Sequence, residues 1–165
     1  NFWYKSVIMV VEDHSQGSLG LVLNKRSQMS VAEFSEQVGC EIDLPGYIYH
    51  GGPVNSKCFS FLHSSEWSCL NTKRINKHFS ISSSTDIFPR LADGDVPDYW
   101  RMFMGTCGWA PGQLTREIQG LSPFTREMSW CLASSTPELV FESDNKDQWV
   151  ASLDRSGLEF AQTIL

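Results

Sequence analysis

The chain has 165 residues, a length typical of one domain with its own hydrophobic core. Hydrophobic residues make up 41% and aromatic residues 12%, which excludes general disorder. The formal net charge of −6 disfavours nucleic-acid binding, because an acidic surface repels phosphate groups, and the nearest candidates for a local basic patch are Lys73, Arg74 and Lys77. No run of eighteen apolar residues predicts a membrane-spanning helix, and no apolar leader with a basic flank opens the sequence. Five cysteines without a C-x-x-C pair are typical of reduced thiols, so we expect a cytoplasmic protein.

The first half of the chain predicts short strands joined by turns and two helices. Residues 2–11 and 19–24 are rich in β-branched and aromatic types, and the polar turn between them predicts a hairpin. Ser30 and Glu33 have the spacing of a capping box, which predicts a helix that ends at Gly39. A second short helix is expected after Asp86. Further strands are predicted at 47–50, 59–63 and 74–82.

The second half centres on residues 99–118. An aromatic, apolar strand at 99–104 is followed by a glycine-flanked turn at 105–108 and by a helix that ends at Gly120. Beyond it the pattern predicts strands at 128–133 and 139–141, a helix that ends by Gly157, and a last short helix at 158–165. Strands and helices interleave without regular alternation. The sequence therefore predicts one compact α+β domain over residues 1–165, with a mixed sheet.

The ordered set of motifs resembles the AlgH/YqgE family of bacterial proteins over essentially the whole chain. The motifs are Ser6–Ile8, His14, Gly17, Gly20–Lys25, Gly51–Val54, Phe61–His63, Asp86, Gly94, Gly105–Glu117, Trp130, Phe141 and Trp149. The resemblance implies a single α+β domain with a mixed, strongly curved sheet flanked by helices. It implies no defined chemistry, because the family's name comes from an association with the regulation of alginate production.

Two departures from the family pattern affect the interpretation. Family members have an additional apolar strand before the segment that matches Asn1-Phe2, and this N-terminal strand is absent here. A missing strand leaves a sheet edge to be covered, which supports dimerisation or strand addition. Family members also commonly carry Ala or Ser where this chain has Cys107. The resemblance therefore argues against Cys107 as an obligatory nucleophile.

The predicted turn at 105–108 allows three interpretations. It can present Cys107 as a nucleophile or redox thiol with His50 or His63 as its base, although a nucleophile elbow would require glycine in place of Trp109. It can bind a small anion through the backbone N–H groups of the Gly105–Pro111 turn. It can also be purely structural, with glycines that allow close packing and a small buried thiol.

Other candidate residues are expected near this turn. Gly51-Gly52-Pro53 is either a structural corner or the rim of a binding surface, and Gln113 and Glu117 lie one helical turn apart. The candidate binding surface comprises Asn24, Lys25, His50, Gly51, Gly52, Pro53, His63, Gly105, Cys107, Gly108, Trp109, Gln113 and Glu117. The four histidines have no metal-ligand spacing, and no nucleotide-binding motif is present, so no metal and no cofactor are predicted.

The favoured interpretation is a non-enzymatic binding or regulatory protein that acts through protein–protein contact. No catalytic residue is assigned, and the sequence leaves open whether the chain is an enzyme. The expected partner is a protein rather than a nucleic acid or a membrane, and a homodimer is one form of it. The alternatives are a cysteine-based redox sensor or enzyme centred on Cys107, and a small anionic ligand at the Gly105–Pro111 turn.

Overall fold

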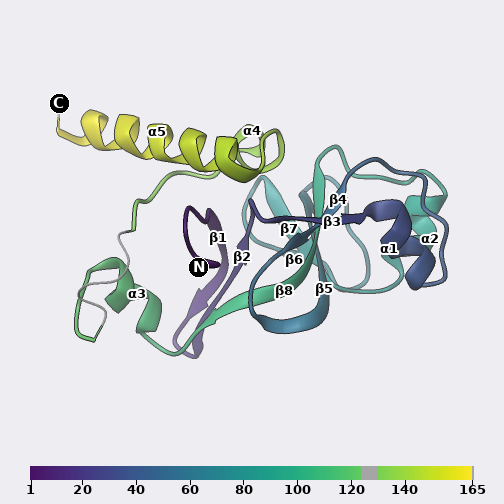
Figure 1. The fold of residues 1–165 in the computed structure, drawn as a ribbon, viewed down its shortest axis with the longest axis horizontal. Coiled ribbons are helices and arrows are strands. Elements are labelled where there is room, and N and C mark those ends of the chain that lie inside the picture. The colour runs from purple at the N-terminus through teal and green to yellow at the C-terminus, as the bar shows by residue number, and fades with distance from the viewer. Residues whose placement is uncertain (124–129, 165) are drawn as a thin grey trace.

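A computed structural model describes residues 1–123 and 130–164 of the chain, which form one α+β domain. Its main feature is a curled sheet with the strand order β1-β2-β8-β5-β7-β6 (Figure 1). The described residues contain eight strands: β1 (Ile8–His14), β2 (Gly17–Val22), β3 (Arg26–Ser30), β4 (Tyr47–His50), β5 (Val54–Ser64), β6 (Lys73–Arg74), β7 (Phe79–Ser82) and β8 (Trp100–Trp109).

Strand β8 lies in the middle of the sheet and holds its parts together. It pairs antiparallel with β2, where Gly20 is opposite Cys107, and with β5, where Phe61 is opposite Met102. It also pairs in parallel with β4, where Tyr49 is opposite Phe103. Among the described strands this is the one parallel pairing, and it makes the sheet mixed, as predicted.

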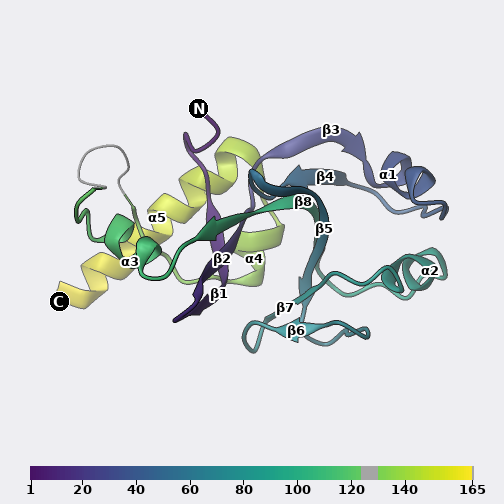
Figure 2. The same ribbon diagram turned by 90° about the horizontal axis from the view of Figure 1, so that it is seen from below.

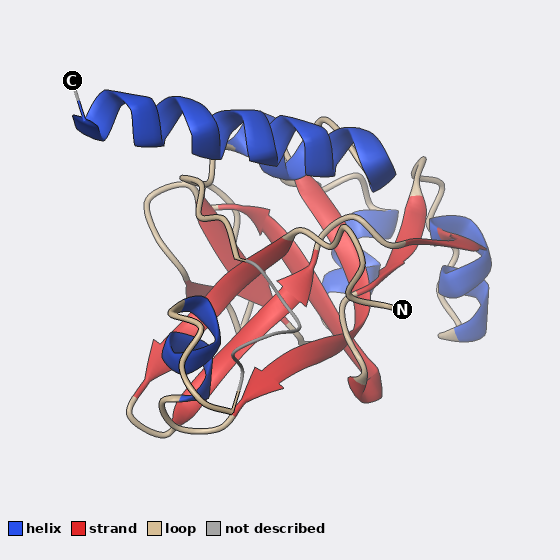
Figure 3. Cartoon of the chain, turned by 60° about the vertical axis from the view of Figure 1, so that its left-hand side comes forward, coloured by secondary structure: helices blue, strands red, loops and turns tan. Residues whose placement is uncertain are grey.

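The helices lie at the two ends and on one side of the sheet. Helices α1 (Val31–Gln37) and α2 (Ile87–Ala92) lie together at one end (Figure 2), and α3 (Gln113–Ile118) lies at the other. Helices α4 (Pro137–Phe141) and α5 (Asn145–Ile164) form the side layer, where α5 runs across the strands (Figure 3). In the described part of the chain, no helix is both long and apolar enough to cross a membrane.

The capping box at the start of α1 is confirmed. The Ser30 hydroxyl accepts a hydrogen bond from the backbone N–H of Glu33 at 3.1 Å, and the Glu33 carboxylate accepts one from the Ser30 backbone N–H at 2.7 Å. These reciprocal bonds satisfy two donors that an isolated helix start leaves free. Phe34 then packs against Phe59 and Phe88 and joins α1 to α2 and the sheet.

Three apolar clusters form the core. One fills the space between α1, α2 and the sheet, and a second lies between the sheet and α4. The third lies beside α3 and consists of Val22, Cys107, Trp109 and Leu114, with Trp3 and Trp130 packed against it. The third cluster matters most for function, because Trp109 and the packed residues Trp3 and Trp130 also line the pocket described below.

Helices α4 and α5 are attached to the sheet by the buried side chain of Arg101. Its guanidinium donates to the backbone oxygens of Leu23 (2.9 Å), Phe141 (3.2 Å) and Ser143 (3.1 Å), and to Oε1 of Gln148 (3.1 Å). Burial lowers the pKa of Arg101. The Gln148 amide in turn donates to Val140 O at 2.9 Å. A single charged side chain on β8 thus links the sheet to both C-terminal helices.

Several sequence-based predictions are wrong in the first half of the chain. The first strand begins at Ile8 rather than at residue 2, because the preceding residues form turns and Lys5 has a positive φ of 52°. The predicted strand at 74–82 is instead the hairpin of β6 and β7. Strand β3 and the first residues of β5 were not predicted, since both segments are polar and largely exposed.

The second half also differs from prediction at three places. Residues 139–141 belong to α4, whose start is marked by the Thr136 N-cap followed by a proline. Helix α5 continues through Gly157 to Ile164 instead of breaking. Residues 130–133 form no strand, and the predicted strand's first two residues lie outside the described residues.

Candidate functional site

The two glycine-containing segments singled out in the sequence cross each other at van der Waals distance. A Cβ on Gly52 would lie 2.1 Å from the Thr106 carbonyl oxygen, and one on Gly51 would lie 2.3 Å from the Gly105 carbonyl oxygen. The Gly51 N–H donates to Met104 O at 2.9 Å, and Gly51 O accepts from Val22 N at 2.8 Å. These glycines therefore allow backbone-to-backbone packing, which corresponds to the structural interpretation of both motifs.

The predicted turn at 105–108 is wrong, because strand β8 continues through it to Trp109. Gly105 absorbs the local distortion with a φ of +78°, while Cys107 and Gly108 pair with β2. Helix α3 begins only after Gly112 and has six residues. The arrangement expected for anion binding, a turn within Gly105–Pro111 that opens a helix, is therefore formed only in its last part, since residues 105–109 are strand and the helix begins at Gln113.

Cys107 lies in the core rather than in a reactive position. Its side chain is 1% exposed, and its thiol donates to Gly51 O at 3.3 Å. Burial raises the pKa of Cys107 to about 12. A thiol with this pKa is overwhelmingly protonated at neutral pH, so it lacks the thiolate that nucleophilic or redox chemistry requires.

Neither histidine considered as a base is placed to activate Cys107. His63 is opposite Trp100, seven residues from Cys107 along β8, or about 23 Å at about 3.3 Å per residue. Its ring nitrogens bond Ser64 O and Ser82 Oγ, and burial lowers its pKa. His50 is exposed and lies opposite Met104, whereas the Cys107 thiol is buried and donates to the backbone oxygen of Gly51.

Asn24 and Lys25 hold the N-terminal segment in place. The buried Asn24 amide donates to Lys5 O at 2.8 Å and to Asn145 O at 2.9 Å, and its oxygen accepts from Val7 N at 2.9 Å. The Lys25 ammonium donates to Tyr4 O at 2.7 Å, and burial lowers its pKa. Both side chains thus hydrogen-bond the backbone of the N-terminal segment, which forms one wall of the neighbouring pocket.

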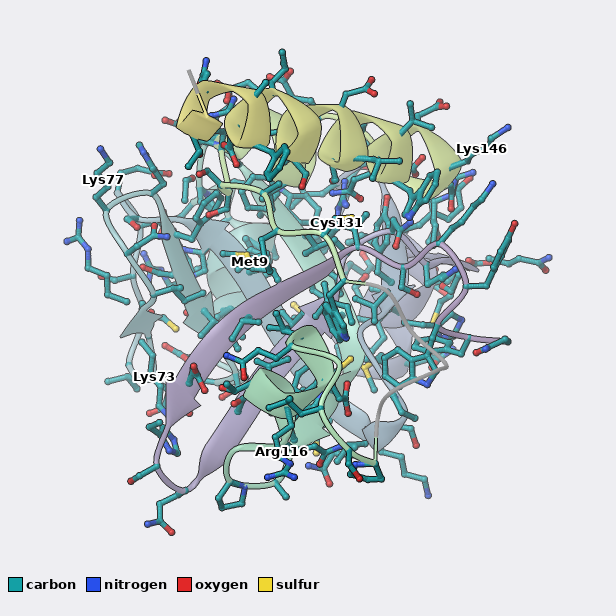
Figure 4. The ribbon with its side chains drawn as sticks, turned by 90° about the vertical axis from the view of Figure 1, so that its left-hand side faces the viewer. Met9, Lys73, Lys77, Arg116, Cys131 and Lys146 are labelled. Atoms are coloured by element: carbon teal, nitrogen blue, oxygen red, sulfur yellow. The ribbon has the colours of Figure 1, made fainter. Side chains whose placement is uncertain are left out.

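The described residues form a pocket with aromatic walls where the N-terminal segment, the end of β8 and α3 meet. Its volume is about 620 Å³. We call it the aromatic pocket; its lining residues are Asn1, Trp3, Tyr4, Lys5, Ser6, Ile8, Gly108, Trp109, Gln113, Glu117, Trp130 and Trp149. Figure 4 shows this side of the molecule, with side chains crowded between α3 and α5 and with Arg116 on the outer side of α3.

The polar side of the aromatic pocket is formed by α3. The Glu117 carboxylate accepts from the Trp109 indole Nε1 at 3.3 Å and from the Gln113 amide at 2.8 Å. Gln113 also accepts from Ala110 N at 3.0 Å, which fixes the loop before the helix. The 113/117 spacing thus places both side chains on one helix face, as predicted, and Trp109 completes the network.

The aromatic side presents indole rings and one cation. The Lys5 ammonium lies 4.9 Å from the Trp149 ring centroid and 5.3 Å from that of Tyr4. Trp109 and Trp130 meet edge to face with centroids 6.3 Å apart. The Trp130 Nε1–H is buried and has no acceptor among residues 1–123 and 130–164.

The sequence predicted one side of this pocket and missed the other. Gly108, Trp109, Gln113 and Glu117 line it, whereas the other nine candidate residues do not. For those nine, a role in binding stays a prediction. Trp130 and Trp149 were interpreted as core residues, and the N-terminal aromatics as part of a strand. The abundance of tryptophan was the available signal, but only the fold brings residues so distant in sequence together.

The described residues contain no group of three or more His, Cys, Asp or Glu side chains arranged to hold a metal ion. A second, more apolar pocket of about 510 Å³ lies between β1 and α5. Met9 and Cys131 belong to its lining and lie between these elements in Figure 4. It lacks a charged lining residue, so the aromatic pocket offers the richer chemistry.

Comparison with known proteins assigns the family. The AlgH-like family (DUF179) matches residues 1–161. A UPF0301 protein of Gluconobacter oxydans is 32% identical over 157 residues, which cover 92% of this chain and 81% of that protein. A UPF0301 protein of Photobacterium profundum is 29% identical over 162 residues, 93% of this chain and 83% of that protein.

Solved structures agree with this assignment. The solution structure of AlgH from Pseudomonas aeruginosa superposes with a TM-score of 0.74 at 29% identity and covers 92% of this chain and 79% of that one. The crystal structure of a Corynebacterium diphtheriae protein, DIP2367, has the same fold, with a TM-score of 0.65 at 24% identity. It covers 91% of this chain and 76% of that one. The chain therefore belongs to the AlgH-like family.

Proposed function

We propose that this AlgH-like chain is a non-enzymatic binding protein that recognises a protein partner with its aromatic pocket. The observation that supports the proposal is the lining itself, in which four tryptophans and one tyrosine surround a hollow of about 620 Å³. Tryptophan and tyrosine are enriched among the residues that carry binding energy at protein interfaces, because they bury a large area at a low entropic cost. A regulatory role would follow if occupancy of the pocket controls the partner.

The alternatives considered for Cys107 and for an anion have less support. A thiol that is 1% exposed with a pKa of about 12 suits packing better than catalysis or redox sensing. The anion hypothesis placed a turn that opens a helix within Gly105–Pro111, but residues 105–109 belong to β8 and α3 begins at Gln113. The proposal therefore concerns recognition through side chains that line an open pocket.

Selection from a library of random peptides displayed on phage tests this proposal. The immobilised wild-type chain is expected to enrich peptides that lose at least tenfold in affinity for a Trp149→Ala variant. Phe160→Ala is the matched control, because Phe160 lies on the same helix, is 69% exposed and does not line the pocket. No enrichment, or peptides that bind the Trp149→Ala variant as tightly as the wild type, would refute the proposal.

A second copy of the chain is a further candidate partner. In the described residues β1 pairs with β2 on one side only, and Val10 on β1 is exposed. An unpaired edge of this kind accepts a strand from another chain. Sedimentation velocity over a range of protein concentrations tests self-association, and a strict monomer at the highest concentration would reject it.

A further inference from the structure

We infer that the aromatic pocket selects a cationic group, a guanidinium or an ammonium, on its occupant. This inference rests on the function proposed above, since it names the chemistry that the same pocket recognises. Its starting point is Glu117, an acidic residue that is 6% exposed and lines the pocket. No lysine, arginine or histidine among the described residues forms an ion pair with it.

A buried carboxylate is costly unless a cation pairs with it, and the two neutral hydrogen bonds that the described residues give Glu117 compensate this cost only in part. The Trp109 indole and the Gln113 amide each donate one bond to Glu117, one to each carboxylate oxygen. Each carboxylate oxygen accepts more than one hydrogen bond, so acceptor capacity remains. A cation that enters the pocket would supply further donors and an opposite charge, which no ion pair within residues 1–123 and 130–164 provides.

The walls of the pocket suit the same ligand. Indole rings attract a cation through the negative electrostatic potential of their faces. This cation–π interaction contributes about 0.5 kcal/mol at an exposed site and about 2 kcal/mol where the pair is buried. Lys5 already uses this attraction within the pocket, where its ammonium lies over Tyr4 and Trp149. The rings of Trp109 and Trp130 stand next to Glu117 and offer further aromatic surface.

Two other features favour a cationic side chain within a peptide. The buried Trp130 Nε1–H has no acceptor within the described part of the chain, and a backbone carbonyl of a bound segment would provide one. The net charge of −6 attracts a basic segment and accelerates its association. A planar guanidinium both stacks on indole rings and forms paired hydrogen bonds with a carboxylate, so arginine fits better than lysine.

Titration with small probes tests the inference directly. N-acetyl-argininamide is compared with its citrulline analogue, which keeps the shape of the side chain but is neutral, and binding is followed by the Trp109 indole N–H signal in NMR spectra. We expect argininamide to bind at least tenfold more tightly, as a charged hydrogen-bond donor does relative to a neutral one. Equal affinity of the two probes would overturn the inference.

n-Propylguanidinium, a monocation that carries the same guanidinium without a backbone, distinguishes the source of the cation. Tighter binding of argininamide than of n-propylguanidinium would point to a protein segment, whereas equal binding would point to a free organic cation. Both outcomes support a cation site, and absence of binding by all three probes at accessible concentrations overturns it.

Two variants and one control variant test which residues give the pocket its selectivity. Glu117→Gln keeps the size of the side chain but removes its charge, and is expected to abolish the preference for argininamide over citrulline. Glu138→Gln, at an exposed position on α4, is the control and should retain it. Lys5→Met removes a competing positive charge from the pocket and is expected to tighten argininamide binding severalfold. This variant keeps the inference testable if Glu117→Gln fails to fold, since weaker or unchanged binding would contradict it.

The displayed peptides separate this inference from the proposed function. Pocket-dependent peptides that share an arginine or lysine support both. Pocket-dependent peptides without a shared cation leave the proposed function standing and overturn the inference. Absence of pocket-dependent peptides refutes the proposed function, and the small probes then decide the inference alone.

Discussion

Replacing Arg101 with methionine should detach the two C-terminal helices from the sheet. Methionine has a similar length but no donor, so the substitution leaves four acceptors without their partner: three backbone oxygens and Oε1 of Gln148. Arg101 is 6% exposed, so water replaces the lost bonds only if the structure opens. The damage should therefore be concentrated where α4 and α5 meet β8.

The expected magnitude follows from those contacts. Four hydrogen bonds at a net value of about 1 kcal/mol each give a loss of about 4 kcal/mol, which lies within the range of roughly 3–5 kcal/mol for removing one partner from a buried charged network. For a chain of this size, about 1 kcal/mol corresponds to roughly 2–4 °C in Tm. The Arg101→Met variant should thus melt roughly 8–16 °C below the wild type.

Urea denaturation followed by tryptophan fluorescence measures the change, and hydrogen exchange shows where it acts. Exchange should accelerate most in α5, because its attachment depends on Arg101 and Gln148. Arg155→Met is the control, since Arg155 forms only an exposed ion pair with Glu159 and should cost less than about 0.5 kcal/mol. A loss below about 1 kcal/mol for Arg101→Met, or exchange that accelerates uniformly, would refute the reasoning.

Three further predictions concern the crossing of the glycine segments and the buried thiol of Cys107. Gly52→Ala should lower the free energy of unfolding in urea by more than about 3 kcal/mol, because the new Cβ would lie 2.1 Å from Thr106 O. The control is Gly39→Ala, where φ is +77° but no atom lies within 4 Å of the new Cβ, and it should cost about 1 kcal/mol. Similar losses in both variants would contradict the steric argument. Cys107 should react with iodoacetamide at pH 8 at least a hundredfold more slowly than the exposed Cys58, and equal rates would show that the thiol is accessible. The pKa of Cys107 is about 12 in the folded chain and about 9 in the unfolded chain. Between about pH 9 and pH 12, unfolding therefore releases the proton of Cys107. The free energy of unfolding should fall as the pH rises through this range. Comparing the pH dependence of unfolding with that of a Cys107→Ala variant measures this contribution, and identical slopes would exclude it.

The elements that local chemistry specifies could be predicted from the sequence. The capping box at Ser30 and Glu33 and the run of aromatic and β-branched residues at 47–49 depend on residues close in the chain. A helix-start signal was also present before α4, where the N-cap residue Thr136 precedes a proline. The apolar residues that follow, 139–141, were nevertheless interpreted as a strand. A run of three or four apolar residues does not distinguish the two structures, because both bury such residues.

Predictions failed where the contacts between distant segments decide the structure. Gly105 and Gly108 are typical of a turn, yet pairing with β2 and the close approach of Gly52 keep this segment extended. Gly157 would weaken an isolated helix, but α5 continues through it, with Glu159 beyond it accepting from Ser134 N. In both places tertiary contacts outweigh a local preference of about 1 kcal/mol.

The candidate site divides in the same way. The sequence by itself determined the α+β class, the family resemblance, and the placement of Gln113 and Glu117 on one face of a short helix, since these depend on composition, motif order and helical spacing. Only the tertiary structure decided that Cys107 is buried and that Trp3, Trp130 and Trp149 surround a common pocket. The physical reason is that burial and pocket formation depend on which segments pack together, and the packing of segments more than a hundred residues apart leaves no local pattern in the chain.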